Sequence, residues 1–377
     1  MSARADCLII GGGVIGLSIA RRLAVDGIKV ILLERTECGK EASWAGAGIL
    51  APCNPHRNDP LSKFQDRSLE IYPSFCAALR DETAIDPEYD PSGEFDLLFT
   101  ENSVSIARSD AAAAAGRVAH DGGAAFELLI KDEVIRMEPC VAPTILGALY
   151  CRMTSQVRNP RLLQALAASC RRRGVEVRER TPVQGLTQVG EKVTGVETPD
   201  GRFEAPHTIL SAGAWSSQFD ARLASIMPVH PVRGQMILLK VDSRPFCRII
   251  SRGKTYLVPR SDGHVLLGST EEPEAGYVKR NSSKAMATLM QTATQLVPSL
   301  ERAEFVAAWS GFRPGTPDER PYIGPVPGFE GLIAATGHYR AGLTLAPATA
   351  DAVAAIVQNR TYDLDLRCCL PGRAVGT

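Results

Sequence analysis

The N-terminal stretch up to residue 34 constrains the fold of this chain more than any other part. Residues 7–10 form a short apolar run that is typical of a buried parallel strand. Residues 11–16 follow directly and contain the pattern G-x-G-x-x-G. Residues 17–25 then carry apolar side chains at helical spacing, and residues 29–33 form a second apolar run. The order strand, glycine turn, helix, strand predicts a parallel α/β unit.

Each of the three motif glycines in this turn has a physical role in nucleotide binding. Gly11 lets the chain leave the strand sharply, Gly13 lets a pyrophosphate approach the backbone, and Gly16 lets the helix pack closely on the strand. The helix N-terminus offers free N–H groups to the phosphates. Glu34 lies 18 residues after Gly16, near the offset expected of an acid that binds a ribose. An acid there favours FAD or NAD over NADP.

Composition limits the classes of partner. The 377 residues contain 42 Lys and Arg against 42 Asp and Glu, so the formal net charge is zero. This balance argues against a nucleic acid or an anionic membrane as main partner. An apolar fraction of 45% without a membrane-length run or a signal peptide leads us to expect a cytoplasmic protein. The ten cysteines lack metal-type spacing, so we expect reduced thiols and no metal site.

The chain is long enough for two domains, and its patterns suggest that they interleave. Helical and apolar strand patterns return after a strand-rich segment, starting with the helix start Asn159-Pro160. The prediction is an α/β fold with a second, α+β domain. The nucleotide-binding domain is expected at 1–85, 159–227 and 311–370. An antiparallel-sheet substrate domain is expected at 86–158 and 228–310, with a tail at 371–377.

Four separated stretches together resemble one family. They are 11–16 with Glu34, 42–49, 208–216, and 309–318 with 337–342. The last pair contains R-P-G-T and G-H-Y-R-x-G, which are more specific than the glycine pattern. The chain resembles the FAD-dependent amine oxidases of the D-amino-acid oxidase superfamily, and within it the glycine oxidases of the thiamine-biosynthesis type. The resemblance covers nearly the whole chain and implies a Rossmann-type FAD-binding domain.

The resemblance also implies site residues. Arg313 of R-P-G-T would bind the substrate carboxylate, and Arg340 and Tyr256 would line the substrate pocket. A planar guanidinium suits a carboxylate because it offers two parallel hydrogen bonds. The implied FAD contacts are Gly11, Gly13, Val14, Ile15, Gly16, Glu34, Arg35, Ala42, Ser43, Ala47, Gly48, Ile49, Val183, His338, Tyr339, Arg340, Ala341, Gly342, Leu343 and Thr344.

Some positions depart from relatives. Gly311 stands where sarcosine-oxidase relatives attach flavin through a cysteine, so we expect non-covalent FAD. Glu271 stands where some glycine oxidases have an apolar residue, and Lys254 replaces a histidine. Either change bears on which amine is accepted. Arg233, in contrast, is interpreted as structural.

The implied reaction is oxidation of glycine, sarcosine or small D-amino acids to the imine and then the 2-oxo acid. The resemblance implies O2 as acceptor, H2O2 as product, a role in thiazole formation, and a homo-oligomer, a dimer or tetramer. Alternatives remain open at this point: an oxidase of N-substituted glycines, a quinone-linked D-amino-acid dehydrogenase, an NAD-dependent dehydrogenase, or a flavin-binding scaffold or sensor without turnover.

Overall fold

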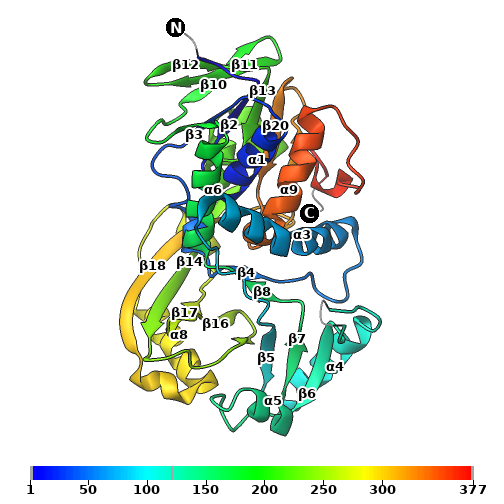
Figure 1. The fold of residues 1–377 in the computed structure, drawn as a ribbon, viewed down its shortest axis with the longest axis vertical. Coiled ribbons are helices and arrows are strands. Elements are labelled where there is room, and N and C mark those ends of the chain that lie inside the picture. The colour runs from blue at the N-terminus through cyan, green and yellow to red at the C-terminus, as the bar shows by residue number, and fades with distance from the viewer. Residues whose placement is uncertain (1–2, 120–121, 375–377) are drawn as a thin grey trace.

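The computed structural model describes residues 3–119 and 122–374 and contains two main sheets that lie one above the other (Figure 1). Residues 375–377 of the predicted tail lie outside the described part. A six-stranded sheet occupies the upper half of the view and an eight-stranded sheet the lower half. No helix within 3–119 and 122–374 combines the length and apolar character needed to cross a bilayer.

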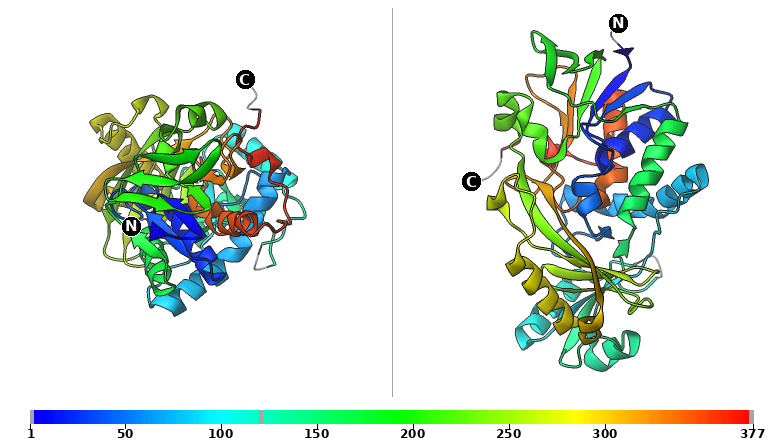
Figure 2. Two further views of the ribbon diagram at one scale, coloured as in Figure 1. Left: turned by 90° about the horizontal axis from the view of Figure 1, so that it is seen from above. Right: turned by 90° about the vertical axis from the view of Figure 1, so that its left-hand side faces the viewer.

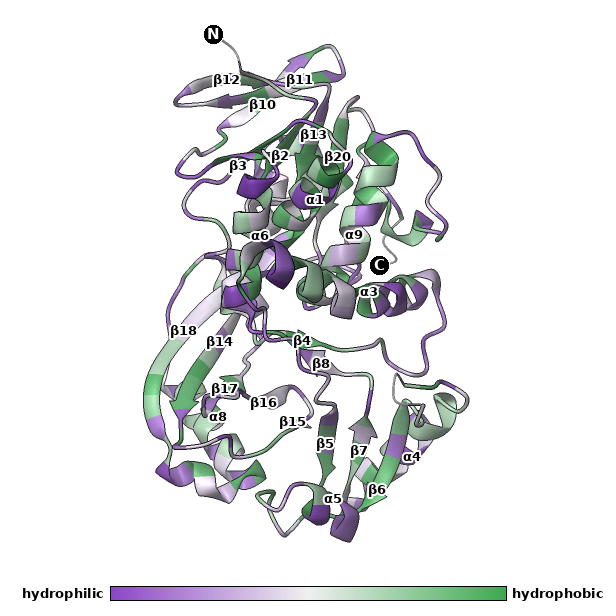
Figure 3. Ribbon diagram, viewed as in Figure 1, coloured by the Kyte–Doolittle hydropathy of each residue, from purple (hydrophilic) through white to green (hydrophobic). Residues whose placement is uncertain are grey.

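The six-stranded sheet is mainly parallel and buried. Its strand order is β19-β20-β13-β2-β3-β9, and only the edge strand β19 runs antiparallel to its neighbour. The strands are β2 (Cys7–Ile10), β3 (Val30–Leu33), β9 (Glu176–Arg178), β13 (His207–Leu210), β19 (Tyr322–Pro325) and β20 (Leu332–Thr336). Apolar colouring gathers on β2, β13 and β20 in Figure 3, as expected of strands covered on both faces.

Helices cover one face of this sheet. They are α1 (Val14–Val25), α3 (Pro60–Thr83), α6 (Asn159–Arg172) and α9 (Gly342–Val357), which share one apolar core. Figure 2 shows α1, α6 and α9 along the same side of the strands. Helix α9 begins at Gly342, the last residue of the 337–342 motif.

The opposite face is covered by a four-stranded sheet and short helical elements, which form a second apolar core. They are β1 (Ala3–Arg4), β10 (Gly185–Val189), β11 (Lys192–Thr198), β12 (Gly201–Glu204), the 3-10 helix η1 (Gly213–Gln218) and α7 (Ala221–Ile226).

The eight-stranded sheet has the order β18-β14-β17-β16-β15-β5-β7-β6. The strands are β5 (Glu94–Leu98), β6 (Phe126–Ile130), β7 (Gly147–Cys151), β14 (His230–Lys240), β15 (Ile249–Arg252), β16 (Thr255–Pro259), β17 (His264–Gly268) and β18 (Glu304–Gly315). Helices α4 (Glu101–Ala113), α5 (Lys131–Met137) and α8 (Ser283–Leu296) pack against it.

One pair in this sheet corrects the expectation of an antiparallel sheet. Strands β5 and β15 are parallel, with Ile249 beside Glu94 and Ser251 beside Asp96. These strands come from separate excursions of the chain, so no hairpin dictates their relative direction. The pair joins the 94–151 strands to the 230–315 strands. The predicted domain boundaries stay a prediction, and the one at 310/311 falls within β18.

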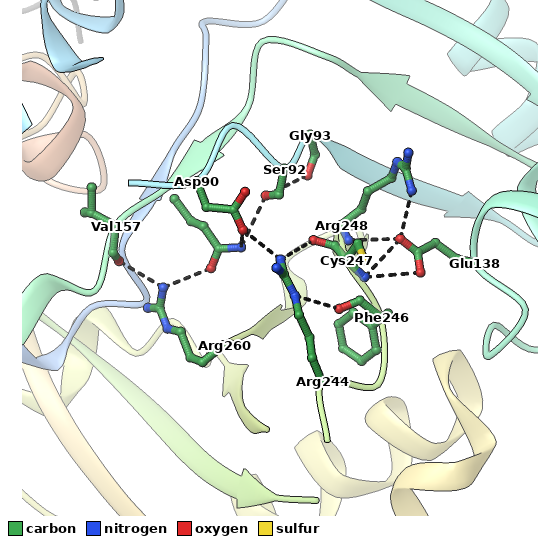
Figure 4. A network of polar contacts seen from close by, with 11 residues as sticks. Asp90, Ser92, Gly93, Glu138, Val157, Arg244, Phe246, Cys247, Arg248 and Arg260 are labelled. Atoms are coloured by element: carbon green, nitrogen blue, oxygen red, sulfur yellow. Dashed lines mark hydrogen bonds and ion pairs between the residues drawn. The ribbon is translucent and has the colours of Figure 1, made fainter. Parts of the chain in front are cut away.

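Buried polar side chains connect parts of the eight-stranded sheet with each other and with the segment before α6 (Figure 4). Glu138 accepts hydrogen bonds from the backbone N–H groups of Cys247 and Arg248 and from the Arg248 guanidinium, at 2.9–3.2 Å. Arg260 donates to the side chain of Gln156 across 2.9 Å and to the carbonyl of Val157 across 3.0 Å. Arg260 is 4% exposed, and burial lowers its pKa to about 10. The Glu138 contacts tie the segment after α5 to the start of β15, and the Arg260 contacts tie β16 to the segment that leads into α6.

Candidate active site

A cavity of about 660 Å³ is lined by residues from both main sheets. It begins at the carboxyl ends of β2, β3, β13 and β20, where ligands of open parallel sheets bind. Its volume lies in the range of small-molecule and cofactor sites. The cavity extends to the inner face of the eight-stranded sheet, so one chamber connects the nucleotide motif with the strands expected to bind substrate.

Most residues singled out in the sequence line this cavity. They are Gly11, Gly13, Val14, Ile15, Glu34, Arg35, Ala42, Ser43, Ala47, Gly48, Ile49, Val183, Tyr256, Arg313, His338, Tyr339, Arg340, Gly342 and Leu343. Gly16, Ala341 and Thr344 lie outside the lining. Gly16 packs against the strand side instead, and Thr344 is buried in α9.

The glycine turn is built for close packing. Gly11 has φ +104°, and a Cβ there would lie 2.5 Å from the carbonyl oxygen of Ser211. A Cβ on Gly16 would lie 2.0 Å from the carbonyl oxygen of Gly11. Gly13 is the N-cap of α1 and supplies no side-chain cap, and the N–H of Val14 donates to the Ser43 hydroxyl across 3.0 Å. Ser43 therefore satisfies the first N–H of the helix, and Gly13 places no side chain between the helix end and the cavity.

Glu34 anchors the turn from the end of β3. One carboxylate oxygen accepts from the N–H of Gly12 across 2.8 Å, and the other accepts from the N–H of Thr36 across 3.0 Å. The side chain is 8% exposed and lines the cavity. An ionised carboxylate accepts more than two hydrogen bonds, so Glu34 retains capacity for ribose hydroxyls.

An aromatic wall near this end was not anticipated as part of the site. The Arg35 guanidinium stacks over Trp215, 3.6 Å from the ring centre, and both residues line the cavity. The ring centres of Tyr277 and Trp215 lie 5.4 Å apart. The only sequence signal was the position of Trp215 within the 208–216 stretch.

Arg313 projects into the other end of the cavity. Its guanidinium donates to the hydroxyl of Ser269 across 2.5 Å and to the carbonyl of Thr270 across 3.1 Å. A Cβ on Gly234 would lie 2.4 Å from the guanidinium, so the glycine on β14 leaves the room that Arg313 occupies. Two hydrogen bonds hold the guanidinium in one orientation and leave further N–H groups for a ligand.

Tyr256 lies on the same face of the sheet as Met236, and its hydroxyl lies 3.5 Å from the Met236 sulfur. Both residues line the cavity, as does Glu94 of β5. Thr154 donates to the Glu94 carboxyl across 3.2 Å, and burial raises the pKa of Glu94. Glu94 was missed in the sequence because an acid in an alternating strand gives no indication of which face it occupies.

Arg340 lines the cavity but is also ion-paired. Its guanidinium donates to the Glu271 carboxylate across 2.9 Å, and Lys254 donates to the same oxygen across 2.6 Å. The Tyr339 hydroxyl donates to the other oxygen. The Lys254 and Tyr339 hydrogen bonds, aided by Arg340, lower the pKa of Glu271 to about 2. The positions that depart from relatives therefore contact each other directly.

Arg233, interpreted as structural, lies away from this cavity lining. It forms an ion pair with Glu272, and its side chain is 7% exposed.

A family model described as FAD dependent oxidoreductase (DAO) matches residues 6–356, which is most of the chain. The chain belongs to the DAO family. A DAO relative from Pseudomonas aeruginosa named glycine oxidase is 38% identical over 95% of this chain and 96% of its own. A bifunctional ThiO/ThiG protein from Trichormus variabilis is 33% identical over 95% of this chain, which spans 53% of that relative. The crystal structure of glycine oxidase from Geobacillus kaustophilus superimposes with a TM-score of 0.93 at 31% identity, covering 100% of both chains.

The cofactor of a DAO family member is FAD, and the residues present fit it. The N-terminus of α1, where Gly13 presents no side chain, suits the pyrophosphate, and Glu34 suits the ribose. Gly311 packs against Ala45, where a Cβ would lie 2.5 Å from the Ala45 side chain. Because residue 311 is glycine, this position offers no thiol to hold the flavin covalently. The individual FAD contacts stay a prediction.

Proposed function

We propose that this DAO family enzyme oxidises glycine and related small amino acids, such as sarcosine and small D-amino acids, to the imine. The imine then hydrolyses to the 2-oxo acid and ammonia, or methylamine from sarcosine, and O2 is reduced to H2O2. The observation that carries this proposal is the Arg313 guanidinium, held in the cavity by Ser269 and Thr270. A carboxylate bound there would lie in the same chamber as the flavin-binding turn.

The chain's own contribution is binding and orientation. Arg313 would fix the substrate carboxylate, and Tyr256 and Met236 would limit the space around the substrate carbon. When bound, FAD would supply the hydride acceptor and the redox chemistry toward O2. Loss of a hydride from carbon requires a neutral amine, so the substrate loses its ammonium proton before that step. Positioning accounts for catalysis without a dedicated base on the protein.

The test is anaerobic mixing of the purified flavoprotein with glycine, sarcosine, D-alanine, D-proline and N-ethylglycine. Loss of the visible flavin absorbance with glycine, followed by peroxide when air is admitted, is the expected result. Reduction by N-ethylglycine alone would replace this proposal with an oxidase of N-substituted glycines. The absence of reduction by every amine would contradict an amine oxidase function.

We also propose that the imine serves thiazole formation in thiamine biosynthesis, a role supported by the relatives named ThiO/ThiG.

We further propose that the protein is cytoplasmic and forms a homo-oligomer, either a dimer or a tetramer. Both proposals rest on the family resemblance. Light scattering of the holoenzyme on a sizing column tests the assembly. A monomer mass at working concentration would contradict it.

A further inference from the structure

Four residues that are distant in the sequence form a rim cluster at the substrate end of the cavity. The rim cluster comprises Lys254, Glu271, Tyr339 and Arg340. Lys254 lies in the turn between β15 and β16, Glu271 follows β17, and the other two precede α9. Lys254, Tyr339 and Arg340 line the cavity, and the side chains of Lys254 and Arg340 are 68% and 44% exposed. The cluster therefore lies between the cavity and solvent.

The three lining residues all donate hydrogen bonds to one carboxylate. One oxygen of Glu271 accepts hydrogen bonds from Lys254 across 2.6 Å and from Arg340 across 2.9 Å. The other oxygen accepts a hydrogen bond from the Tyr339 hydroxyl. Two cations and a phenol around a carboxylate are the donor set expected of a binding site for an anionic ligand group. Here the protein's own side chain occupies that site, and it is 20% exposed.

The rim cluster lies next to the site expected to bind the substrate carboxylate. Arg313 is held by Ser269 and Thr270, the two residues directly before Glu271. Residues 269 and 271 are separated by at most about 7 Å along the backbone. The donors that hold Glu271 therefore line the same cavity as Arg313, within reach of a second carboxylate on an amine bound there.

We propose that Glu271 is a specificity-determining residue that excludes amines carrying a second carboxylate, because it already occupies the carboxylate-binding position of the rim. This inference rests on the proposed function for its biological meaning. A second ligand carboxylate would find Lys254 and Arg340 already paired with Glu271 and would have to displace it, which discriminates against that ligand. Neutralising Glu271 would release Lys254 and Arg340 to bind a second carboxylate. The preference would then shift from ligands with one carboxylate to ligands with two, while Arg313 stays in place.

The test uses the holoenzyme and redox-inert ligands. Methoxyacetate carries one carboxylate, and diglycolate is the corresponding ether with two. Each is titrated while the visible flavin band is recorded, so the readout is binding and not turnover. Glu271→Gln is expected to raise the affinity ratio of diglycolate to methoxyacetate at least about tenfold over wild type. Glu274→Gln removes a nearby exposed acid outside the cluster and should leave the ratio unchanged.

Further variants separate specificity from a purely structural role. If Glu271 only stabilised the rim, its replacement would weaken both ligands equally, and an unchanged ratio would overturn the proposal. Adding Lys254→Ala to Glu271→Gln should reverse most of the gain in diglycolate binding. Lys254→Ala alone alters an exposed side chain and should lower the wild-type ratio, which provides a test if the Glu271 variant does not fold.

Kinetics then connect the inference to catalysis. With Glu271→Gln, kcat/KM for iminodiacetate should rise relative to its monoamide, which has the same size and one charge less. If wild-type enzyme is reduced by no amine, the proposed function fails while the ligand-binding ratio still decides the role of Glu271. If glycine reduces the flavin and the ratio is unaffected by Glu271→Gln, only the specificity inference fails.

Discussion

The Nη2 atom of Arg313 lies 2.5 Å from the hydroxyl oxygen of Ser269, which together with the Thr270 carbonyl fixes the guanidinium inside the cavity. This relationship gives an arginine near the end of a long edge strand one defined orientation. The side chain is held by two hydrogen bonds and has N–H groups left for a carboxylate. The first prediction follows from this geometry.

Replacing Arg313 with lysine should raise KM for glycine about 10- to 100-fold, because an ammonium cannot form the two parallel hydrogen bonds of a guanidinium. Steady-state peroxide production checks this expectation. Arg302→Lys is a suitable control, since that side chain is 88% exposed. An unaltered KM in the Arg313 variant would show that the carboxylate binds elsewhere.

Gly16→Ala should destabilise the protein by about 1–3 kcal/mol and reduce its flavin content, because the new methyl group overpacks the turn. The added Cβ would lie 2.0 Å from the Gly11 carbonyl oxygen. Urea unfolding and the ratio of flavin to protein absorbance measure both effects. Gly185→Ala, where no atom lies within 4 Å of the added Cβ, should change stability by less than about 0.5 kcal/mol. Equal behaviour of the two variants would contradict the packing argument.

Glu138→Ala should lower the free energy of unfolding by about 3 kcal/mol, because it leaves Arg248 and two backbone N–H groups without their acceptor. Glu138 is 3% exposed. Guanidinium unfolding of the purified protein provides the measurement. Glu301→Ala, at a side chain that is 65% exposed, is the control expected to be nearly neutral. A loss below about 1 kcal/mol for Glu138→Ala would mean that water replaces the carboxylate.

Stability should fall as the pH is lowered through the range in which His338 would titrate in the unfolded chain. Burial lowers the pKa of His338 from 6.5 to about 3, so the folded protein keeps the ring neutral. Below pH 6.5 the unfolded chain binds a proton that the folded chain excludes, and the lost stability reaches about 1.5 kcal/mol between pH 6.5 and 5.

Unfolding curves at several pH values test this linkage. His338→Gln should flatten the pH dependence by that amount, whereas His230→Gln, at an exposed position, should leave the slope as in wild type. An identical slope in wild type and His338→Gln would show that other groups cause the pH dependence.

The local sequence determined the nucleotide-binding unit, because the residues that define this unit lie close together in the chain. The strand at 7–10, the glycines and Glu34 lie within 28 residues, and each meets its partner through a turn or a neighbouring strand. The physical reason is that the φ angles of the glycines and the N–H groups of the helix end depend on adjacent residues, although Gly11 also packs against Ser211 of the neighbouring strand segment. The prediction of this unit needed no knowledge of distant contacts. Family motifs then indicated Arg313, which the structure places in the same cavity.

Only the tertiary structure decided how distant segments meet. The parallel pairing of β5 with β15, the stacking of Arg35 on Trp215 and the convergence of Lys254 and Arg340 on Glu271 have no local sequence signature. These contacts depend on the direction in which each chain segment returns to the sheet. They also depend on which side chains then lie close enough to pair with a charged group. Short motifs therefore indicate the family and the cofactor, whereas the contacts around Glu271 form only when the whole chain has folded.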